Sequence, residues 1–314
     1  MTDAAPAIGN AAQPATPTEG SLSKSDIAHF EAIAQFAHRT AGLVLSRDKA
    51  PMVLARVGKR MRALGLESLG DYHDYLSSDA GDAERSELLF ALTTNVTSFF
   101  REKHHFDVLR DSLLPALARR ARSGDRIRLW SAGCSTGQEP YSIAMTILEA
   151  LPEAPRCDIR ILATDIDRKV LARARAGTFD AGQAETVPEA LRRKYLLPVA
   201  TSRAGHPASS AYQVSDDLRG IVVFRELNLL EEWPMRGKFD AIFCRNVVIY
   251  FDRDTQARLW PKFAKALQPD GLLFLGHSER IDTAQFPQFR PAGTTYYQLD
   301  GAIGHDVRRA PEWH

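Results

Sequence analysis

From Gly124 onward the sequence alternates short apolar segments with longer segments of helical periodicity. Buried strands are expected for five apolar segments, at residues 127–131, 159–164, 221–225, 239–245 and 272–276. Helices are expected between several of these strands, at residues 138–150, 168–176 and 254–267. Because parallel strands need crossover connections of this length, the pattern predicts an α/β fold with a mostly parallel sheet and helices on both faces.

The segment before this pattern has helical periodicity only. Apolar residues recur at helical spacing from Ser23 onward, at Ile27, Phe30, Ile33, Ala34 and Ala37. Three further helices are expected at residues 52–64, 69–76 and 83–93. Residues 22–95 are therefore expected to form an all-α domain. Residues 1–21 are mostly Ala, Pro, Thr and Gly, and we expect a disordered tail there.

Residues 178–220 interrupt the alternation of strands and helices. They are polar, contain Gly, Pro and Ser, and are too long for an ordinary connection. This stretch is expected to be either a small inserted subdomain or a long functional loop. It belongs to an α/β domain expected over residues 96–300, with a C-terminal tail at 301–314.

The charge balance excludes several classes of protein. With 40 basic and 39 acidic residues the net charge is +1, which excludes a chain that coats nucleic acid by charge alone. No apolar run approaches the roughly 18 residues of a membrane helix, and no export signal is recognisable. Three cysteines form no CxxC pair. We therefore expect a cytoplasmic protein without a nucleic-acid partner, membrane insertion or structural zinc.

The connection between the first expected strand and its helix carries the strongest ligand signal. Gly133 and Gly137 follow a GxxxG spacing, without the GxGxxG spacing of dinucleotide sites. Small residues at this strand–helix turn let a ligand approach the backbone. Asp165 ends the next expected strand, where a carboxylate can accept hydrogen bonds from both ribose hydroxyls. The pattern favours an adenosine ligand that lacks a pyrophosphate.

The same turn also permits a different function. Gly133–Gly137 matches the GxSxG nucleophile elbow of serine hydrolases, with Ser135 as nucleophile and Asp252 and His277 downstream as partners. However, no HGGG-like oxyanion segment precedes the turn, and Asp252 is also well placed to begin a helix. A serine hydrolase remains one alternative, and a non-catalytic ligand-binding adaptor is another.

Five ordered blocks together resemble one known family. They are TTNVTSFFRE at 93–102, the turn at 130–142, ATDID at 163–167, FDAIFCRNVVIYF at 239–251 and PDGLLFLGHSE at 269–279. The chain resembles the CheR family, chemotaxis receptor methyltransferases that use S-adenosylmethionine to methylate receptor glutamates. The resemblance implies a helical N-terminal domain and a Rossmann-like methyltransferase domain with a small inserted β-subdomain. The stretch 198–220 departs from the glycine-containing β-loop of members that dock on a receptor pentapeptide.

The resemblance also implies roles for single residues. Contacts with S-adenosylmethionine are implied for Asn95, Thr97, Arg101, Glu139, Asp165, Asn228, Leu229, Arg245 and Asn246. Arg101 and Tyr250 are implied to lie nearest the reaction, where a planar guanidinium fork and a hydroxyl fit the two oxygens of a carboxylate. A glutamate carboxylate is already anionic at neutral pH, with a pKa near 4.3, so no general base is required.

The helix at 53–64 suggests how a receptor is held. Its apolar residues share one side, and we place four cations on the opposite side, namely Arg56, Lys59, Arg60 and Arg62. We hypothesise that these cations dock the acidic helices of a receptor. His104 and His105 are expected at the surface without a metal, and Cys134 and Cys244 are expected to be packing residues. We expect a monomer.

Overall fold

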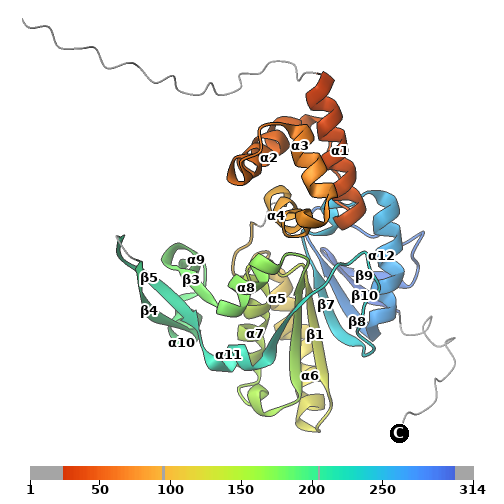
Figure 1. Ribbon diagram of the computed structural model, residues 1–314. Coiled ribbons are helices and arrows are strands. Elements are labelled where there is room, and N and C mark those ends of the chain that lie inside the picture. The colour runs from red at the N-terminus through yellow and green to blue at the C-terminus, as the bar shows by residue number, and fades with distance from the viewer. Residues whose placement is uncertain (1–23, 94–95, 204–205, 301–314) are drawn as a thin grey trace, which may run out of the picture.

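The computed structural model describes residues 24–93, 96–203 and 206–300, and Figure 1 shows a helical domain above the upper edge of an α/β domain. The helical domain contains α1 (Lys24–Ala41), α2 (Ala50–Leu64), α3 (Leu69–Ser77) and α4 (Asp82–Leu92). Its core is built from one face of each helix and includes Phe30, Ile33, Val57, Tyr72 and Leu88. The four helices predicted from periodicity are present, with their ends within two residues where we specified them.

The α/β domain contains a seven-stranded sheet of order β6-β2-β1-β7-β8-β10-β9. The parallel strands are β1 (Ile127–Ala132), β2 (Ile159–Asp165), β6 (Val222–Glu226), β7 (Phe239–Cys244) and β8 (Leu267–Leu275). The antiparallel strands β9 (Phe289–Gly293) and β10 (Tyr296–Leu299) complete one edge. The chain runs outward from β1 through β2 to β6 and then returns to β7 on the other side. The carboxyl ends of β1 and β7 therefore form the switch point at which such sheets bind ligands.

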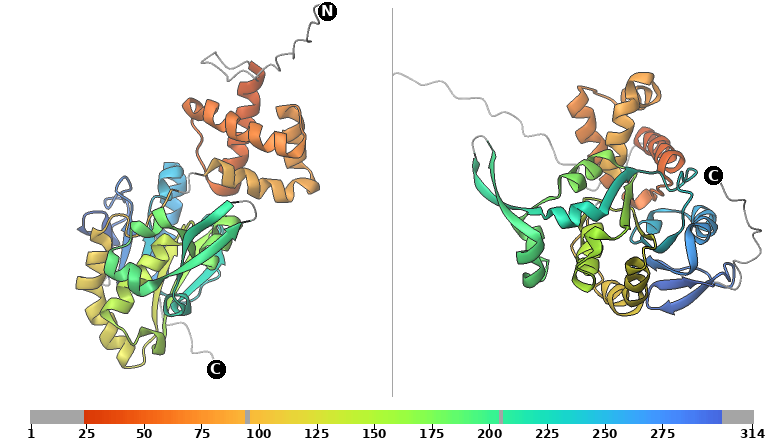
Figure 2. Two further views of the ribbon diagram at one scale, coloured as in Figure 1. Left: turned by 90° about the vertical axis from the view of Figure 1, so that its left-hand side faces the viewer. Right: turned by 90° about the horizontal axis from the view of Figure 1, so that it is seen from below.

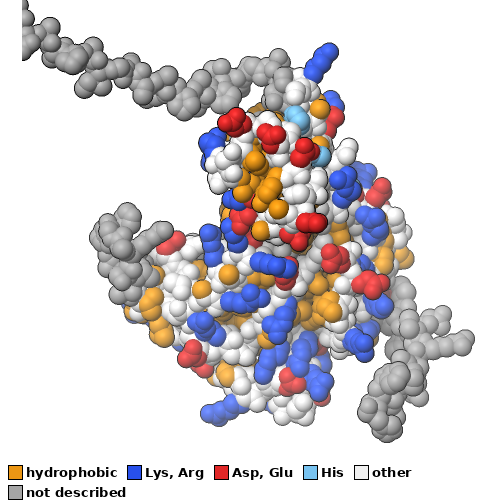
Figure 3. All heavy atoms as spheres, in the orientation of Figure 1, with side chains coloured by type: hydrophobic (Ala, Val, Ile, Leu, Met, Phe, Trp, Pro, Cys, Tyr) orange, Lys and Arg blue, Asp and Glu red, His pale blue; other side chains and the backbone are white. Residues whose placement is uncertain are grey.

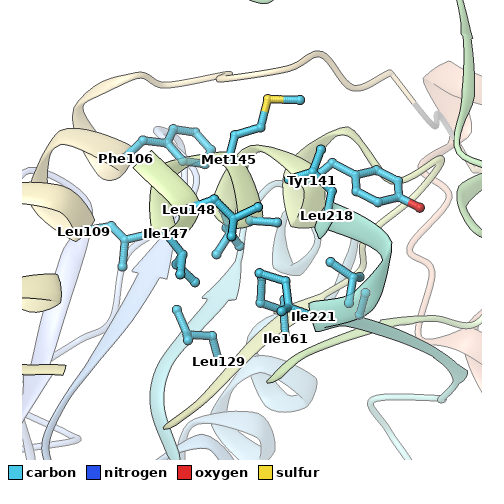
Figure 4. Close-up of a cluster of buried hydrophobic side chains, with 14 of the residues drawn as sticks. Phe106, Leu109, Leu129, Tyr141, Met145, Ile147, Leu148, Ile161, Leu218 and Ile221 are labelled. Carbon is cyan, nitrogen blue, oxygen red and sulfur yellow. The ribbon is translucent and has the colours of Figure 1, made fainter. Parts of the chain in front are cut away.

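Helices cover both faces of this sheet. One face packs against α5 (His104–Val108), a π-helical turn (Leu109–Leu113), α6 (Leu114–Arg122), α7 (Gln138–Ala150) and α11 (Asp216–Ile221). Figure 4 shows the core of that face, where Leu129 and Ile161 meet Ile147 and Leu148 of α7. The other face packs against α12 (Arg253–Ala266). Because side chains alternate along a strand, Trp130 points to this second face.

A small subdomain is inserted after α8 (Arg168–Ala176). Its antiparallel strands are β3 (Thr178–Asp180), β4 (Leu196–Arg203) and β5 (His206–Val214), and their order in the sheet is β3-β5-β4. The helices α9 (Ala181–Glu185) and α10 (Glu189–Tyr195) lie between β3 and β4 in the chain. Figure 2 shows that it projects away from the main sheet. The predicted fold class is thereby confirmed, and 178–220 contains a subdomain rather than a plain loop. The helices at 104–122 and the strands β9 and β10 were not predicted.

No helix within the described ranges is long and apolar enough to cross a membrane.

Candidate functional site

A cleft lies where the helical domain meets the carboxyl ends of β1, β2, β6 and β7. It is bounded on the helical side by Ala41, Leu43, Leu89 and Thr93. Eight of the nine residues predicted to contact the methyl donor line it, namely Thr97, Arg101, Glu139, Asp165, Asn228, Leu229, Arg245 and Asn246. Tyr250 lines it as well. The ninth residue, Asn95, lies outside the described residues.

The turn that contains Gly133 and Gly137, called the glycine turn below, lines this cleft through Gly133, Cys134 and Ser135. The backbone N–H groups of Gly133 and Cys134 both donate to the carbonyl of Thr164, each at 2.8 Å. Gly133 has a φ of +85°, and a Cβ at this position would lie 2.3 Å from the Cγ2 of Val247. Any side chain there would therefore be strained and would collide with the far wall of the cleft.

Asp165 ends β2 directly beside this turn. Its Oδ2 accepts from the backbone N–H of Ser135 at 2.8 Å, and its Oδ1 accepts from that of Asp167 at 3.0 Å. Burial raises the pKa of Asp165 to about 6, although these backbone donors act in the opposite direction. Each carboxylate oxygen has a second acceptor site, so the held carboxylate can still receive two hydroxyl groups.

A buried guanidinium connects two carboxylates at the end of β7. This Arg245 cluster consists of Arg245, Glu139 and Glu102, and the Arg245 side chain is only 2% exposed. Arg245 donates to Glu139 Oε2 at 3.1 Å and to the carbonyl of Arg101, and its Nη2 lies 3.5 Å from Glu102 Oε2. Burial raises the pKa of Glu139. Burial also acts to raise the pKa of Glu102, but Arg245 and other donors bring it below its ordinary value.

Glu279 organises the loop that follows β7, a role that sequence analysis missed. Its carboxylate accepts from the backbone N–H groups of Asn246 (2.9 Å), Val247 (2.9 Å), Ile249 (3.2 Å) and Gly276. Asn246 adopts a φ of +57°, which asparagine tolerates better than most residues. The sequence signal was a glutamate inside the block 269–279, but three of its four partners, Asn246, Val247 and Ile249, lie 30 or more residues away.

Glu102 and His105 were also missed, and the expected surface position of the histidine pair is wrong for His105. His105 is fully buried, its Nε2 lies 2.8 Å from Thr295 Oγ1, and its Nδ1 lies 3.6 Å from Glu102 Oε2. Burial lowers the pKa of His105 to about 3, so the ring is neutral near pH 7. Ligand atoms of Glu102, His104 and His105 lie within 4.8 Å of one another, close enough for a divalent cation to bind.

Arg101 and Tyr250 both line the cleft. Arg101 Nη1 donates to the carbonyl of Val96 at 3.0 Å, and Val96 is 73% exposed. Tyr250 packs against the core of the helical domain, and its carbonyl accepts from the backbone N–H of Val44 at 2.8 Å. The second of the two predicted catalytic residues therefore lies where both domains meet.

Asn228 has a structural contact that the sequence did not predict. Its Nδ2 donates to the carbonyl of Thr40 in α1 at 2.9 Å, and its Oδ1 accepts from the backbone N–H of Leu230 at 3.0 Å. His38 Nε2 lies 2.6 Å from Asp252 Oδ2 across the same boundary. These contacts hold the helical domain over the cleft.

The four predicted docking cations do not share one exposed face. Arg60 donates to Glu84 at 2.9 and 2.6 Å and lies 3.2 Å from Glu87, so its placement on that face is wrong. The reason is that Arg60 lies seven residues after the buried Val53, about 20° from it on the helix, where it meets Glu84, which is only 3% exposed. Arg56 is half-buried and donates to the carbonyl of Leu92 at 3.0 Å. Lys59 and Arg62 are exposed, and their docking role remains a prediction.

The serine hydrolase alternative is not supported. Asp252 caps α12 through the backbone N–H of Thr255 and pairs with His38, while His277 Nδ1 lies 3.4 Å from Glu102. Both presumed partners of Ser135 therefore have other roles. Cys134 and Cys244 are buried, and burial raises the pKa of each thiol well above its ordinary value, in keeping with packing residues.

Comparison with known families shows to which family the chain belongs. Residues 95–297 match the family model "CheR methyltransferase, SAM binding domain", and residues 28–93 match "CheR methyltransferase, all-alpha domain". The chain belongs to the CheR methyltransferase family. It is an S-adenosylmethionine-dependent methyltransferase, and the predicted membership, enzyme class and methyl donor are confirmed.

Curated relatives align with this chain along nearly their whole length. The chain is 48% identical to a "Probable chemotaxis protein methyltransferase" of Rhizobium etli, over 82% of this chain and 94% of the relative. It is 43% identical to a "Chemotaxis protein methyltransferase" of Salmonella typhimurium, over 88% and 92%. It is 42% identical to "Chemotaxis protein methyltransferase 2" of Pseudomonas aeruginosa, over 85% and 91%. The adaptor alternative therefore has no support.

The residues of the cleft fit the donor of this CheR methyltransferase. Gly133 lets the turn pack directly against Val247, and Asp165 offers acceptor sites for ribose hydroxyls. Among the described residues, Ser135 Oγ and Arg245 Nε are buried without a hydrogen-bond partner in the protein. Buried polar atoms of this kind are rare, and a polar ligand in the cleft would explain them.

Proposed function

We propose that this CheR methyltransferase methylates glutamate side chains of chemotaxis receptors and forms glutamate methyl esters. The observation that carries the proposal is that a guanidinium and a phenol, Arg101 and Tyr250, both line the cleft. A guanidinium suits a carboxylate acceptor and would repel a cationic one. The names of the curated relatives, which place them in chemotaxis, support a receptor as the acceptor.

Methyl transfer to a carboxylate requires the protein to position donor and acceptor, and it does not require a general base. S-adenosylmethionine supplies a methyl group bound to a positively charged sulfur. Arg101 and Tyr250 would hold the acceptor carboxylate in line with that methyl group, and such positioning lowers a barrier by roughly 7–11 kcal/mol. Asp165, Glu139 and the glycine turn would hold the donor. The Arg245 cluster fixes Glu139 and the backbone of Arg101 together, so donor and acceptor share one support.

Recognition of the receptor is proposed to use the remaining exposed cations of α2, Lys59 and Arg62. Receptor segments that carry methylated glutamates are acidic, and a basic surface would attract them. We also propose that the helical domain corresponds to residues 22–95 and the methyltransferase domain to 96–300, and that the enzyme acts as a monomer in the cytoplasm.

The test is transfer of label to a receptor fragment followed by alkali. The full-length enzyme is incubated with methyl-tritiated S-adenosylmethionine and purified receptor signalling fragments. A glutamyl ester releases its label as volatile methanol in base, whereas an N-methyl product retains it. A fragment with its acceptor glutamates replaced by alanine serves as the control. Label that is stable in alkali, or incorporation that is equal in the control fragment, would contradict the proposal.

A further inference from the structure

A second cavity adjoins the donor cleft and has a different charge. It lies between α4, the start of α8 and the loop that follows β6, and we call it the acidic vestibule. It shares five lining residues with the cleft, namely Leu89, Thr93, Ile166, Leu227 and Asn228. The two cavities therefore meet at the side of the cleft formed by the ends of β2 and β6. Arg101, Arg245 and Tyr250 line the cleft but not the vestibule.

The charged lining of the vestibule is mostly acidic. Asp167, Glu226, Glu231 and Glu232 line it together with a single cation, Arg168. Arg168 is already paired with Glu226, with Nε and Oε2 2.6 Å apart. Figure 3 shows acidic and basic side chains side by side along the junction of the two domains. The nearby Lys262 lies outside the lining and donates to the carbonyls of Leu229 and Glu231.

Asp167 adds a buried charge to the lining of the vestibule. The residue is only 9% exposed, and its Oδ1 caps α8 by accepting from the backbone N–H of Lys169 at 2.7 Å. Its Oδ2 is buried and has no hydrogen-bond partner among the described residues. An unpartnered carboxylate oxygen inside a cavity favours positively charged ligands.

The cleft itself differs in charge from the vestibule. Arg101 and Arg245 line the cleft together with Glu139 and Asp165, and Arg101 donates to the carbonyl of Val96. An anionic acceptor is attracted to Arg101 and repelled by the vestibule. The cleft therefore adjoins a cavity that is more acidic than the cleft itself.

We propose that the acidic vestibule is the passage by which S-adenosylmethionine enters the cleft, and that its carboxylates favour the cationic donor over the uncharged product. The donor carries a net charge of +1 from its sulfonium, ammonium and carboxylate groups. S-adenosylhomocysteine lacks the sulfonium charge and is neutral overall. An acid-lined cleft raises the local concentration and association rate of a cation but not of a neutral zwitterion. This inference rests on the donor and is independent of the receptor as acceptor.

The charge is tested with the double variant Glu231→Gln, Glu232→Gln, in which shape and hydrogen-bonding capacity are largely kept. Association is measured by stopped-flow mixing, with tryptophan fluorescence as the signal and a pulse-chase with radiolabelled ligand as an independent readout. At low ionic strength the association rate constant for S-adenosylmethionine is expected to fall about three- to tenfold. The rate constant for S-adenosylhomocysteine should stay the same. The matched control Glu67→Gln, Glu185→Gln removes two exposed carboxylates elsewhere and should change neither rate.

The route is tested separately with Ser86→Trp, which places a bulky side chain on α4 at the vestibule wall. Both ligands should then associate and dissociate more slowly, while Arg101 and Tyr250, which do not line the vestibule, keep their positions. Unchanged exchange of both ligands in Ser86→Trp would overturn the passage. An unchanged donor rate in Glu231→Gln, Glu232→Gln, or equal slowing of donor and product, would overturn the role of charge. None of these readouts uses a receptor, so failure of the proposed function would leave them intact.

Discussion

Two arginines of this protein each lie between two glutamates, but the two clusters are completed differently. In the Arg60 cluster, of Arg60, Glu84 and Glu87, the buried Glu84 accepts two bonds from Arg60 and one from Tyr72 at 2.8 Å. In the Arg245 cluster, Glu102 Oε2 and Arg245 Nε are buried and have no hydrogen-bond partner in the described part of the chain. The satisfied cluster lies in the core of the helical domain, and the unsatisfied one borders the donor cleft. The difference indicates that the first serves stability and the second serves a ligand.

The largest expected effect concerns the Arg60 cluster. Arg60→Met should lower the free energy of unfolding by about 3 kcal/mol, because it leaves Glu84 as a buried charge without its counter-ion. Urea unfolding measures this loss. The exposed neighbour change Lys59→Met is the control and should stay within about 0.5 kcal/mol of the wild type. A fully stable Arg60→Met would show that the two clusters do not differ in the way we infer.

A change in the Arg245 cluster should reduce the stabilisation that the protein gains when the donor binds. S-adenosylmethionine at a hundred times its dissociation constant should stabilise the wild type by about 2.7 kcal/mol. Arg245→Met should lose most of this gain, because Glu139 then lacks the cation that orients it. Arg60→Met should keep the gain despite its lower starting stability. Thermal unfolding with and without donor compares them, and an equal response of both variants would remove the distinction between the clusters.

The raised pKa of Asp165 predicts that both stability and donor affinity depend on pH. With its pKa raised to about 6 in the folded protein from 3.8, ionisation of Asp165 lowers the stability of the unliganded protein as the pH rises between those values. Donor binding needs the ionised form, so affinity should fall about tenfold per pH unit below pH 6. Asp165→Asn should weaken binding at pH 7.5 by about 1.5–3 kcal/mol.

Calorimetry from pH 5 to 7.5 measures how donor affinity depends on pH in the wild type and how much affinity Asp165→Asn loses. The affinity of Asp165→Asn should be nearly independent of pH over this range. His105 cannot supply the dependence, because its pKa of about 3 keeps it neutral throughout. If Asp165→Asn retains the wild-type slope, the titrating group is another buried acid, for which Glu139 is the first candidate.

A smaller effect is expected at the acceptor side of the cleft. Tyr250→Phe removes one proposed hydrogen bond to the acceptor carboxylate, worth about 1–1.5 kcal/mol, and should slow kcat roughly tenfold. Donor affinity should hardly change, because the hydroxyl is assigned to the acceptor. Steady-state kinetics with receptor fragments and calorimetry with donor separate the two. Weaker donor binding together with a normal kcat would reverse the assignment.

The smallest effect concerns the exposed cations beside the Arg60 cluster. Lys59→Glu together with Arg62→Glu should raise the KM for receptor fragments about two- to fivefold at low salt, with donor affinity unchanged. The increase should shrink as salt screens the charges. Lys238→Glu with Lys265→Glu reverses two exposed cations of the methyltransferase domain as a control. If both double variants give the same KM, α2 has no special role in docking.

The sequence alone determined the features that depend on neighbours in the chain. The alternation of strands and helices predicted the parallel sheet, because periodicity reports burial over a few residues. The glycine turn and Asp165 could be placed together because each follows a strand, and parallel strands end at one edge of a sheet. The resemblance added the identity of the donor, which spacing could not provide.

Only the tertiary structure decided the features that join distant segments. Arg245 meets Glu139 from 106 positions away, and Glu279 binds the backbone of Asn246 across 33 positions. The basic side of α2 was misread for a different reason, because at 100° per residue Arg60 lies only about 20° from the buried Val53. What the structure added is its partner, since α4 supplies Glu84 to Arg60 from 24 positions away. Spacing shows on which face of a helix a residue lies. How the helices pack decides whether a buried carboxylate lies opposite that face.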